Sequence, residues 1–321
     1  MIRLFVALLL LSLPQFARAL DAPVSAPSAI AELRTTWNDA ARRREVPVVI
    51  FYPKTGGPFP LIIISHGLGG SRDTLDYLGK YWASHGYVCA QIQHLGTDDA
   101  LWRNAPDEEA ANAALSRAAG TLANILNRPR DVSFAIDQML KLNADPNSPL
   151  QGKINPAQIG VAGHSLGAFT ALASAGQKLI GAGGALDLSD SRIKACVAVS
   201  APLNPQAPVA DQFADFKVPL FYIVGAQDNQ VLGATIAHRQ IYDAIAAPRQ
   251  YLLIMGGADH MTFAGERFGP DEPNDARDHA LTQTATLAFW DAELKADAAA
   301  KSWLQTDLKA QLQAGSAFEM K

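Results

Sequence analysis

The stretch Gln158–Gly176, QIGVAGHSLGAFTALASAG, runs from an apolar segment through one serine into a row of small residues. Ser165 stands between Gly163 and Gly167 in the pattern G-x-S-x-G. This pattern is typical of a sharp strand-to-helix turn, in which a Cβ two residues to either side of the serine would collide across the turn. An isolated match is most often an ordinary turn, but here an apolar strand precedes it and a helix follows. We therefore expect Ser165 to project above a sheet, at the start of a helix whose N–H groups face developing negative charge.

Apolar strand-like segments recur along the chain, with helical patterns between them. Several are continuously apolar, as is typical of strands buried on both faces of a parallel sheet. The expected strands cover 46–53, 60–67, 86–93, 158–165, 193–200, 219–225 and 250–257. The expected helices cover 74–84, 130–142, 166–177, 234–246 and 278–294. This alternation predicts an α/β fold, with a mostly parallel sheet of about eight strands and helices on both faces.

Two parts of the chain depart from this alternation. Residues 32–53 are typical of an antiparallel hairpin at the sheet edge, turning near Asn38–Asp39. The interval 94–156 is longer than a crossover requires, and about 97–127 of it predicts a helical insertion before the nucleophile strand. The insertion is either a lid or pocket wall, or a helix that merely packs on the surface. Trp102 within it either lines a substrate pocket or anchors packing.

The amino terminus differs in composition from the rest of the chain. Arg3, an apolar run and the small residues Ala17-Arg18-Ala19 together predict a secretory signal over 1–19. The apolar run is too short to span a bilayer, which takes about 20 apolar residues. We therefore expect cleavage at the end of this segment, a single domain over 20–321, and a secreted or periplasmic protein without a stable membrane anchor.

Composition and charge bound the classes of partner. Of the 321 residues, 49% are hydrophobic and 18% charged, which suffices for a large core. The formal net charge is −4, and loss of the signal removes two positive charges and no acids, which gives −6. With Arg42–Arg44 as its basic run, such a chain gives little electrostatic reason to expect nucleic acid as a partner. Cys89 and Cys196 lie in apolar strands that we do not expect to be neighbours, so we predict two unpaired core residues.

A serine hydroxyl is a poor nucleophile unless a base removes its proton. Among the seven histidines, His260 has the position expected of that base, because it follows a late apolar strand, 95 residues after Ser165. We expect His164, beside the serine, to pack or to hydrogen-bond locally. We expect His279 to lie at a solvated helix start.

The base needs an acid that orients it and stabilises its charged form. Asp228, in VGAQDNQV, lies just after the strand that begins at Pro219, and we select it over the alternative of a turn-forming aspartate. Asp259 is the immediate neighbour of the base, so we expect its side chain to diverge from the ring. Asp211 and Asp215 precede a strand and are weaker candidates.

Attack on a carbonyl creates an oxyanion, which needs aligned donors. The N–H of Leu166, directly after the serine, is one candidate donor, and the N–H of Leu68 in the glycine-rich loop His66–Gly70 is the other. That loop has neither the Lys-Ser/Thr pair nor the G-x-G-x-x-G spacing of a phosphate-binding loop. The chain also has no H-E-x-x-H, no paired-cysteine motif and no histidine cluster at ligand spacing, so we expect no metal and no cofactor.

The segments ISHGLGGSRD, GHSLGAFTAL, VGAQDNQV and GADHMTF, in this order, resemble the α/β-hydrolase superfamily over nearly all of the chain beyond the signal. More narrowly, WNDAARRREVPVVIFYP followed by SHGLGG resembles secreted bacterial hydrolases related to platelet-activating-factor acetylhydrolase and predicted dienelactone hydrolases. The resemblance implies a serine esterase that cleaves carboxylic esters, with Ser165 as nucleophile, His260 as base, and Leu68 and Leu166 as oxyanion donors.

Two features depart from these narrower families. In platelet-activating-factor acetylhydrolases the acid follows the strand just after the nucleophile's helix, but VSAPLNP has no carboxylate there, which moves the acid to Asp228. Dienelactone hydrolases use a cysteine nucleophile, whereas this elbow holds Ser165. A lipase, polyester depolymerase or amidase is an alternative on the same fold. A catalytically silent binding protein is a further alternative, and the complete set of serine, acid and histidine argues against it.

Overall fold

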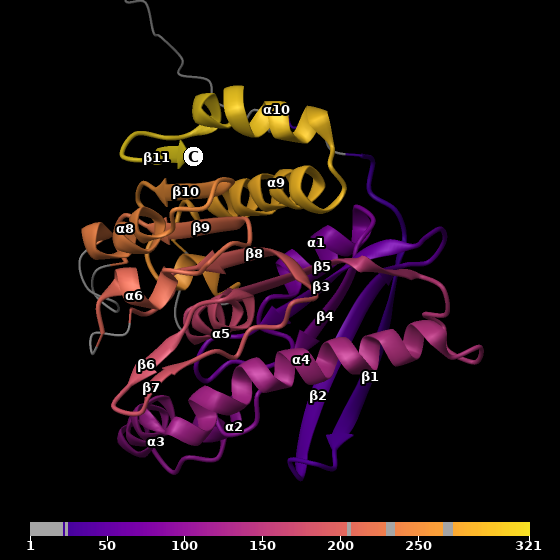
Figure 1. Cartoon of the computed structure of the whole chain (residues 1–321), viewed down its shortest axis with the longest axis vertical. Coiled ribbons are helices and arrows are strands. Elements are labelled where there is room, and N and C mark those ends of the chain that lie inside the picture. Colours follow the sequence, from indigo (N-terminus) through magenta and orange to yellow (C-terminus); the bar gives the residue numbers. More distant parts are fainter. Residues whose placement is uncertain (1–21, 23–24, 204–206, 229–234, 266–271) are drawn as a thin grey trace, which may run out of the picture.

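A twisted sheet runs through the whole computed structural model, which describes residues 22, 25–203, 207–228, 235–265 and 272–321. The signal predicted over 1–19 lies outside the described residues. The strands of the main sheet are β1 (Ile30–Asp39), β2 (Arg44–Pro53), β3 (Phe59–Ser65), β4 (Val88–Ile92), β5 (Ile154–His164), β8 (Ile193–Val199), β9 (Leu220–Gly225), β10 (Gln250–Met255) and β11 (Ala317–Met320). Their order in space is β1-β2-β4-β3-β5-β8-β9-β10-β11 (Figure 1).

The pairing explains why the sheet is mostly parallel. The six strands from β4 to β10 in this order pair in parallel, while β1, β2 and β11 pair antiparallel at the two edges. The main sheet of the described residues thus has nine strands rather than about eight. The additional strand, β11, has only four residues, and its Phe318 pairs with Leu253 of β10. A strand this short has no long apolar run, so the apolar pattern gave no sign of it.

The edge hairpin turns slightly later than expected. Asn38 and Asp39 still pair with Glu45 and Arg44, so the turn covers residues 40–43. The turn thus begins directly after Asn38–Asp39, near which it was predicted, because residues that favour turns in isolation can also end a strand.

Helices cover both faces of the sheet, as the α/β alternation predicts. One face carries α4 (Leu122–Ala144), α5 (Leu166–Ala175), α6 (Val209–Phe213) and α8 (Thr235–Ala244). The opposite face carries α1 (Asp76–Ser84), α9 (Asp275–Leu294) and α10 (Ala298–Thr306). Alternate side chains along one strand lie on opposite faces of the sheet. In β3, Leu61 and Ile63 belong to the core on the first face, whereas Ile62 and Ile64 belong to the core on the second. This double burial is why the strands are continuously apolar.

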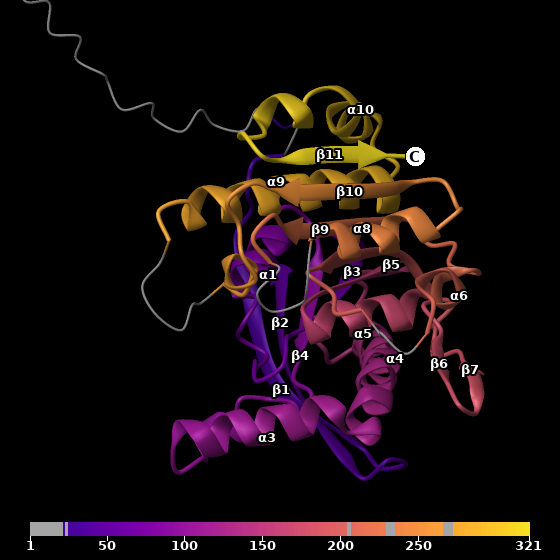
Figure 2. The same cartoon turned by 90° about the vertical axis from the view of Figure 1, so that its left-hand side faces the viewer.

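The predicted insertion is helical. It comprises α2 (Ala100–Arg103), α3 (Glu108–Gly120) and the first residues of α4. Figure 2 shows α3 at one end of the molecule, near α4. The main helix begins at Leu122 and not near 130, because it continues through Pro129, which lacks the N–H that would bond to Ile125.

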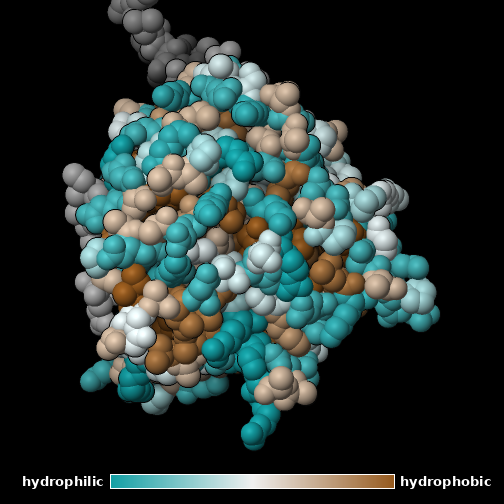
Figure 3. All heavy atoms as spheres, in the orientation of Figure 1, coloured by the Kyte–Doolittle hydropathy of each residue, from teal (hydrophilic) through white to brown (hydrophobic). Residues whose placement is uncertain are grey.

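The face seen in Figure 3 has a mixed composition, and both cysteines are buried. Figure 3 shows a mixture of hydrophilic and hydrophobic residues, with a hydrophobic group at the lower left, where Figure 1 places α5 and the hairpin of β6 (Leu179–Gly181) and β7 (Gly184–Leu186). No helix among the described residues is long and apolar enough to cross a membrane. Cys89 and Cys196 are free and buried, and β3 and β5 separate their strands, so the prediction of two unpaired core residues is confirmed.

Candidate active site

Ser165 occupies a strained turn between β5 and α5. Its backbone has φ 56° and ψ −124°, a region that costs a residue with a side chain on the order of 1–3 kcal/mol. A Cβ on Gly163 would lie 2.2 Å from the Gly167 carbonyl oxygen, and a Cβ on Gly167 would lie 2.0 Å from the Ser65 carbonyl oxygen. Both glycines are therefore required. One leaves room across the turn, and the other lets α5 approach the end of β3.

A line of hydrogen bonds joins the serine to a histidine and a carboxylate from distant parts of the chain. His260 Nε2 lies 2.9 Å from Ser165 Oγ, and His260 Nδ1 lies 2.8 Å from Asp228 Oδ1. Because a neutral imidazole has one donor and one acceptor, Nδ1–H donates to the carboxylate and Nε2 accepts the serine proton. Asp228 is fully buried and His260 nearly so. The structure thus brings together the three residues that the sequence selected.

Neighbouring parallel strands position the acid and the base. Asp228 follows β9 and His260 follows β10, so both lie at the carboxyl edge of the sheet, where α/β proteins place their ligands. The Gln227 N–H donates to the Ala258 carbonyl at 2.9 Å and ties the two loops together. A Cβ on Gly225 would lie 2.3 Å from that same carbonyl oxygen, so glycine is needed where the loops cross.

Two other histidines contact this site in ways that the sequence did not reveal. His164 Nε2–H donates to the His260 carbonyl at 2.9 Å, so its hydrogen bond is not local, as we had expected, but reaches the base itself. Burial holds the pKa of His164 well below its usual range, which keeps the ring neutral. His279 is partly buried rather than solvated, and its Nε2 lies 2.6 Å from the Thr262 carbonyl. His164 also packs against the rings of His260 and Phe263, as the packing alternative predicts, whereas the expectation of a solvated His279 was wrong because its acceptor lies in another loop.

The weaker acid candidates lie elsewhere. Asp259 Oδ1 accepts hydrogen bonds from the Thr262 N–H at 2.9 Å and hydroxyl at 3.1 Å, so it turns away from the His260 ring as predicted. Asp211 and Asp215 are exposed, and Asp215 pairs with Lys178.

The loop His66–Gly70, hereafter the His66 loop, follows β3 and lies beside the serine. A Cβ on Gly67 would lie 3.3 Å from Ser165 Cβ. Leu166 is the first residue of α5. Within the described part of the chain, neither the Leu68 N–H nor the Leu166 N–H donates to a protein acceptor. Two backbone donors beside the nucleophile are therefore available to a developing oxyanion.

A cavity of about 520 Å³ adjoins the His66 loop. Its wall is largely apolar and comes from that loop and from the insertion: Leu68, Gly69, Trp102, Ala105, Asp107, Glu108, Ala111, Asn112 and Leu115. Trp102 lines the cavity, and its indole N–H also donates to the Gly69 carbonyl at 2.7 Å. Trp102 therefore lines a cavity and is also anchored to the His66 loop. In the described ranges, no group of three or more histidine, cysteine or acidic residues is arranged to hold a metal ion.

Comparison with known proteins gives matches along most of the chain. The family described as "Platelet-activating factor acetylhydrolase, isoform II" matches residues 46–114, and the family "PET hydrolase-like" matches residues 120–268. A cutinase (est2) of Thermobifida alba is 27% identical over 214 residues, which cover 66% of this chain and 56% of that protein. Cutinase 2 of Thermobifida cellulosilytica is 26% identical over 229 residues, 70% of this chain and 66% of that protein. The platelet-activating factor acetylhydrolase of Cavia porcellus is 29% identical over 140 residues, 37% of this chain and 32% of that protein.

The matched region thus spans between a third and two thirds of these relatives' own lengths. The first family match covers most of β2, the His66 loop and the first part of the insertion, and the second contains Ser165, Asp228 and His260. Together with the mostly parallel sheet and the serine elbow at the carboxyl edge of its strands, these matches show an α/β-hydrolase fold in a chain that resembles the platelet-activating factor acetylhydrolases and the cutinases.

Proposed function

We propose that this protein is a serine hydrolase that cleaves carboxylic esters through an acyl-enzyme intermediate. The observation that carries the proposal is the hydrogen-bonded line from Asp228 through His260 to Ser165 at a strained elbow. The descriptions of the matched families, an acetylhydrolase and a PET hydrolase-like family, support hydrolytic chemistry. The signal predicted over 1–19 makes secretion or export to the periplasm part of the same proposal.

The proposed reaction uses each group in turn. His260 Nε2 takes the proton of Ser165 Oγ as the oxygen attacks the ester carbonyl, and the Asp228 carboxylate stabilises the imidazolium that forms. The N–H groups of Leu68 and Leu166 bind the oxyanion. His260 then gives its proton to the departing alcohol, which leaves Ser165 acylated. In the second half-reaction, His260 takes a proton from a water molecule as the water oxygen attacks the acyl carbon. The proton then passes from His260 to Ser165 Oγ as the carboxylic acid product is released.

The cavity beside the His66 loop is the proposed site for the acyl part of the ester. Its wall offers the apolar side chains of Leu68, Trp102 and Leu115, and apolar surface retains a hydrocarbon chain because burial removes that chain from water. Of the alternatives on this fold, the matches to cutinases and to the PET hydrolase-like family favour an ester or polyester over an amide.

Serine substitution and active-site labelling test this proposal. Protein lacking residues 1–19 should hydrolyse p-nitrophenyl acetate and butyrate, and a fluorophosphonate probe should add once, at Ser165, as read by intact and peptide mass spectrometry. Ser165→Ala should lower kcat by about 10⁴-fold or more, because the nucleophile is lost while binding remains.

The matched control is Ser174→Ala. Ser174 lies in α5 and is buried, and its hydroxyl donates to the Thr170 carbonyl at 2.9 Å, so hydrolysis and labelling should persist. Hydrolysis by Ser165→Ala at the wild-type rate would refute the proposal. Wild-type protein that neither hydrolyses these esters nor reacts with the probe would instead be a silent binding protein.

A further inference from the structure

The peptide between Gly67 and Leu68 carries one of the two proposed oxyanion donors. This peptide is trans, so the Gly67 carbonyl and the Leu68 N–H point in opposite directions from one plane. Any group that holds the carbonyl therefore also aims the N–H. The Gly67 carbonyl oxygen lies 2.6 Å from His66 Nδ1 and accepts the Gly70 N–H at 3.2 Å.

The protonation of His66 follows from its two neighbours. The backbone N–H of His94 donates to His66 Nε2 at 3.0 Å, which makes that nitrogen an acceptor. Because a neutral imidazole carries one hydrogen, it must lie on Nδ1, which then donates to the Gly67 carbonyl. Burial, and after it the nearby charge of Arg128, hold the pKa of His66 well below its usual range, so the ring stays neutral in this arrangement.

Arg128, a residue of α4, hydrogen-bonds to the backbone of the His66 loop. It is fully buried, and its guanidinium donates to the His66 carbonyl and, at 2.7 Å, to Thr97 Oγ1. A third bond, at 2.8 Å, reaches Thr170 Oγ1 in α5, directly behind the serine elbow. Thr97 in turn accepts the Gly69 N–H at its carbonyl, at 2.8 Å. Both arms of the His66 loop are therefore fixed to the core.

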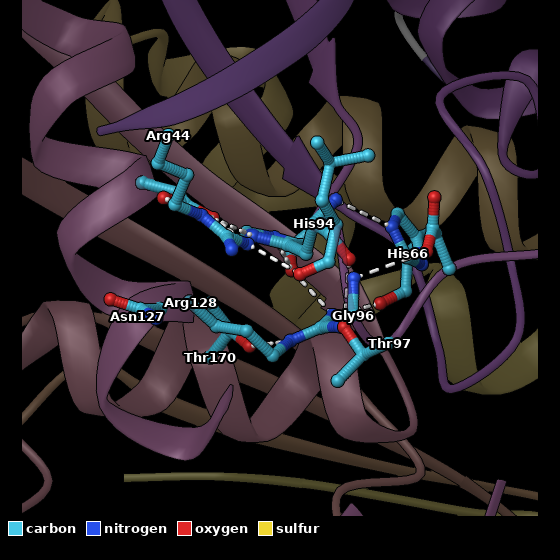
Figure 4. A network of polar contacts seen from close by, with 12 residues as sticks. Arg44, His66, His94, Gly96, Thr97, Asn127, Arg128 and Thr170 are labelled. Atoms are coloured by element: carbon cyan, nitrogen blue, oxygen red, sulfur yellow. Dashed lines mark hydrogen bonds and ion pairs between the residues drawn. The ribbon is translucent and has the colours of Figure 1, made fainter. Parts of the chain in front are cut away.

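His94 is held by a second Ser–His–Asp line, and all three of its residues are fully buried. Ser65 Oγ lies 2.9 Å from His94 Nε2, and His94 Nδ1 lies 2.9 Å from Asp131 Oδ2. Asp131 is paired with Arg44, and Figure 4 shows His94 between Arg44 and His66. Substrate cannot reach a hydroxyl buried in this way, so this line cannot act as a nucleophile. It instead fixes the residue whose backbone N–H selects the His66 tautomer.

We infer that His66 is a positioning residue of the proposed reaction, which aims the Leu68 N–H at the oxyanion, and that Asp131, His94 and Arg128 hold it in place. The hydrogen bond at the Gly67 carbonyl also polarises the peptide and strengthens the Leu68 N–H as a donor. This inference rests on the proposed function, because it takes Ser165 as the nucleophile and Leu68 as a donor.

Replacing His66 by asparagine or by glutamine tests the roles of the two ring nitrogens separately. In His66→Asn the side-chain amide lies near the position of Nδ1 and can still donate to the Gly67 carbonyl. In His66→Gln the longer side chain reaches the position of Nε2, so it can still accept the His94 N–H but releases the carbonyl. His66→Gln should lower kcat by about 10–100-fold, since outright loss of an oxyanion donor costs about 10²–10³-fold. KM should change by less than about three-fold, because the donor acts on the transition state. His66→Asn should recover most of kcat.

Hydrolysis of a thionoester, the C=S analogue of an ester, distinguishes a positioning role of His66 from a merely structural one. Sulfur accepts hydrogen bonds weakly, so an oxyanion hole favours a p-nitrophenyl ester over its C=S analogue. His66→Gln should lower the ratio of the two rates by about the same factor as kcat. Its thermal midpoint, measured alongside, reports any general loss of folding. The matched control is His85→Gln, because His85 is also buried and bonds the Tyr81 carbonyl through Nδ1 at 2.7 Å, in a different part of the fold. Its kcat and rate ratio should equal those of the wild type.

A measurement on the unchanged protein is independent of how the variants fold. With ¹⁵N-labelled histidine, the NMR signals of His66 should show hydrogen on Nδ1 and none on Nε2 between pH 6 and 8. Hydrogen on Nε2, or a charged ring, would overturn the inference. So would a folded His66→Gln with wild-type kcat, or equal losses on the oxygen and sulfur esters. The proposed function itself fails if Ser165→Ala remains active, or if the wild type neither hydrolyses the esters nor reacts with the probe, which separates the two failures.

Discussion

At the scale of single residues, the acid of the proposed triad can be tested by removing its charge. Asp228→Asn keeps the size of the side chain but replaces the carboxylate that accepts His260 Nδ1–H at 2.8 Å. The amide favours the wrong imidazole tautomer, so kcat should fall by about 10⁴-fold, the loss known for the equivalent change in a well-studied serine protease. Steady-state hydrolysis of p-nitrophenyl butyrate measures this.

The control for that change is Asp259→Asn, beside the base in sequence but bonded to Thr262. It should keep kcat within a few-fold of the wild type, because its carboxylate does not contact the imidazole. An Asp228→Asn variant with near-normal kcat would show that another group serves as the acid.

His164 gives a second prediction, in which the two amide replacements exchange roles relative to His66. Its Nε2–H, not Nδ1–H, makes the functional contact, to the His260 carbonyl. His164→Gln places an amide near that nitrogen and should stay active, whereas His164→Asn should lose about ten-fold in kcat, the worth of one net hydrogen bond. Assays of both variants at equal folded concentration measure this. The reverse order of activities would contradict the contact.

The sequence identified the candidate triad because its members are marked by chain order: the elbow is a local pattern, and acid and base each follow a strand. His66, His94 and Arg128 carry no such mark. They meet because β3 and β4 are neighbours and each is followed within two residues by one of the histidines, while Arg128 of α4 contacts the His66 carbonyl. Two histidines placed just after adjacent apolar strands were the available signal. His94 and Arg128 lie 28 and 62 residues from His66 in the sequence, so their contacts with it could not be predicted from sequence spacing.

At the scale of elements, long apolar strands were predictable and short or interrupted elements were not. The central strands are buried on both faces, so their composition alone marks them. β11 owes its place to pairing with β10, and α4 continues through Pro129 because packing of its apolar face against the sheet outweighs one missing hydrogen bond. Tertiary contacts decide such cases.

The helix α3 offers a prediction about substrate length. Leu115 lines the cavity, and a Cβ on Gly69 would lie 2.9 Å from its Cδ2, so the helix packs directly on the His66 loop. Leu115→Trp should fill part of the cavity and exclude longer acyl chains. Each buried methylene is worth about 0.8 kcal/mol, so the ratio of kcat/KM for p-nitrophenyl octanoate to that for acetate should fall by at least about ten-fold.

The control for α3 is Leu122→Trp at the start of α4, where the side chain is 67% exposed and does not line the cavity. Its ratio should match the wild type. An unchanged ratio in Leu115→Trp would mean that the acyl chain binds elsewhere.

At the scale of the whole molecule, two Ser–His–Asp lines have their serine and histidine at the carboxyl ends of strands, and the acid of the second line, Asp131, comes from α4. In the line through Ser165 the serine is partly exposed, whereas all three residues of the line through Ser65 are fully buried. Three buried histidines are neutral in the folded protein. Burial lowers the pKa of His94 to about 3, and burial also holds the pKa values of His66 and His164 well below their usual range. The stability of the fold must then depend on pH.

The sign of that dependence follows from proton binding. An unfolded histidine titrates near pH 6.5, so below that pH the unfolded chain binds protons that the folded protein refuses. The histidine contribution is therefore complete above about pH 6.5 and is lost as pH falls toward the folded pKa values, by about 1.4 kcal/mol per pH unit for each histidine. Asp131 adds to this only at lower pH: although burial raises its pKa, the hydrogen bond from His94 and the ion pair with Arg44 hold it at about 2.

Urea unfolding between pH 4.5 and 8 measures this prediction. The free energy of unfolding should be nearly level above pH 7 and should fall steeply from pH 6.5 to 4.5, where the carboxylates contribute little. His94→Asn keeps a donor to Asp131 but cannot take up a proton, so its slope in that window should be shallower by about one proton, or 1.4 kcal/mol per pH unit. Equal stability of the wild type at pH 5 and pH 7.5 would show that the buried rings are charged in the folded protein. An unchanged slope in His94→Asn would show that His94 is not among the groups that resist protonation.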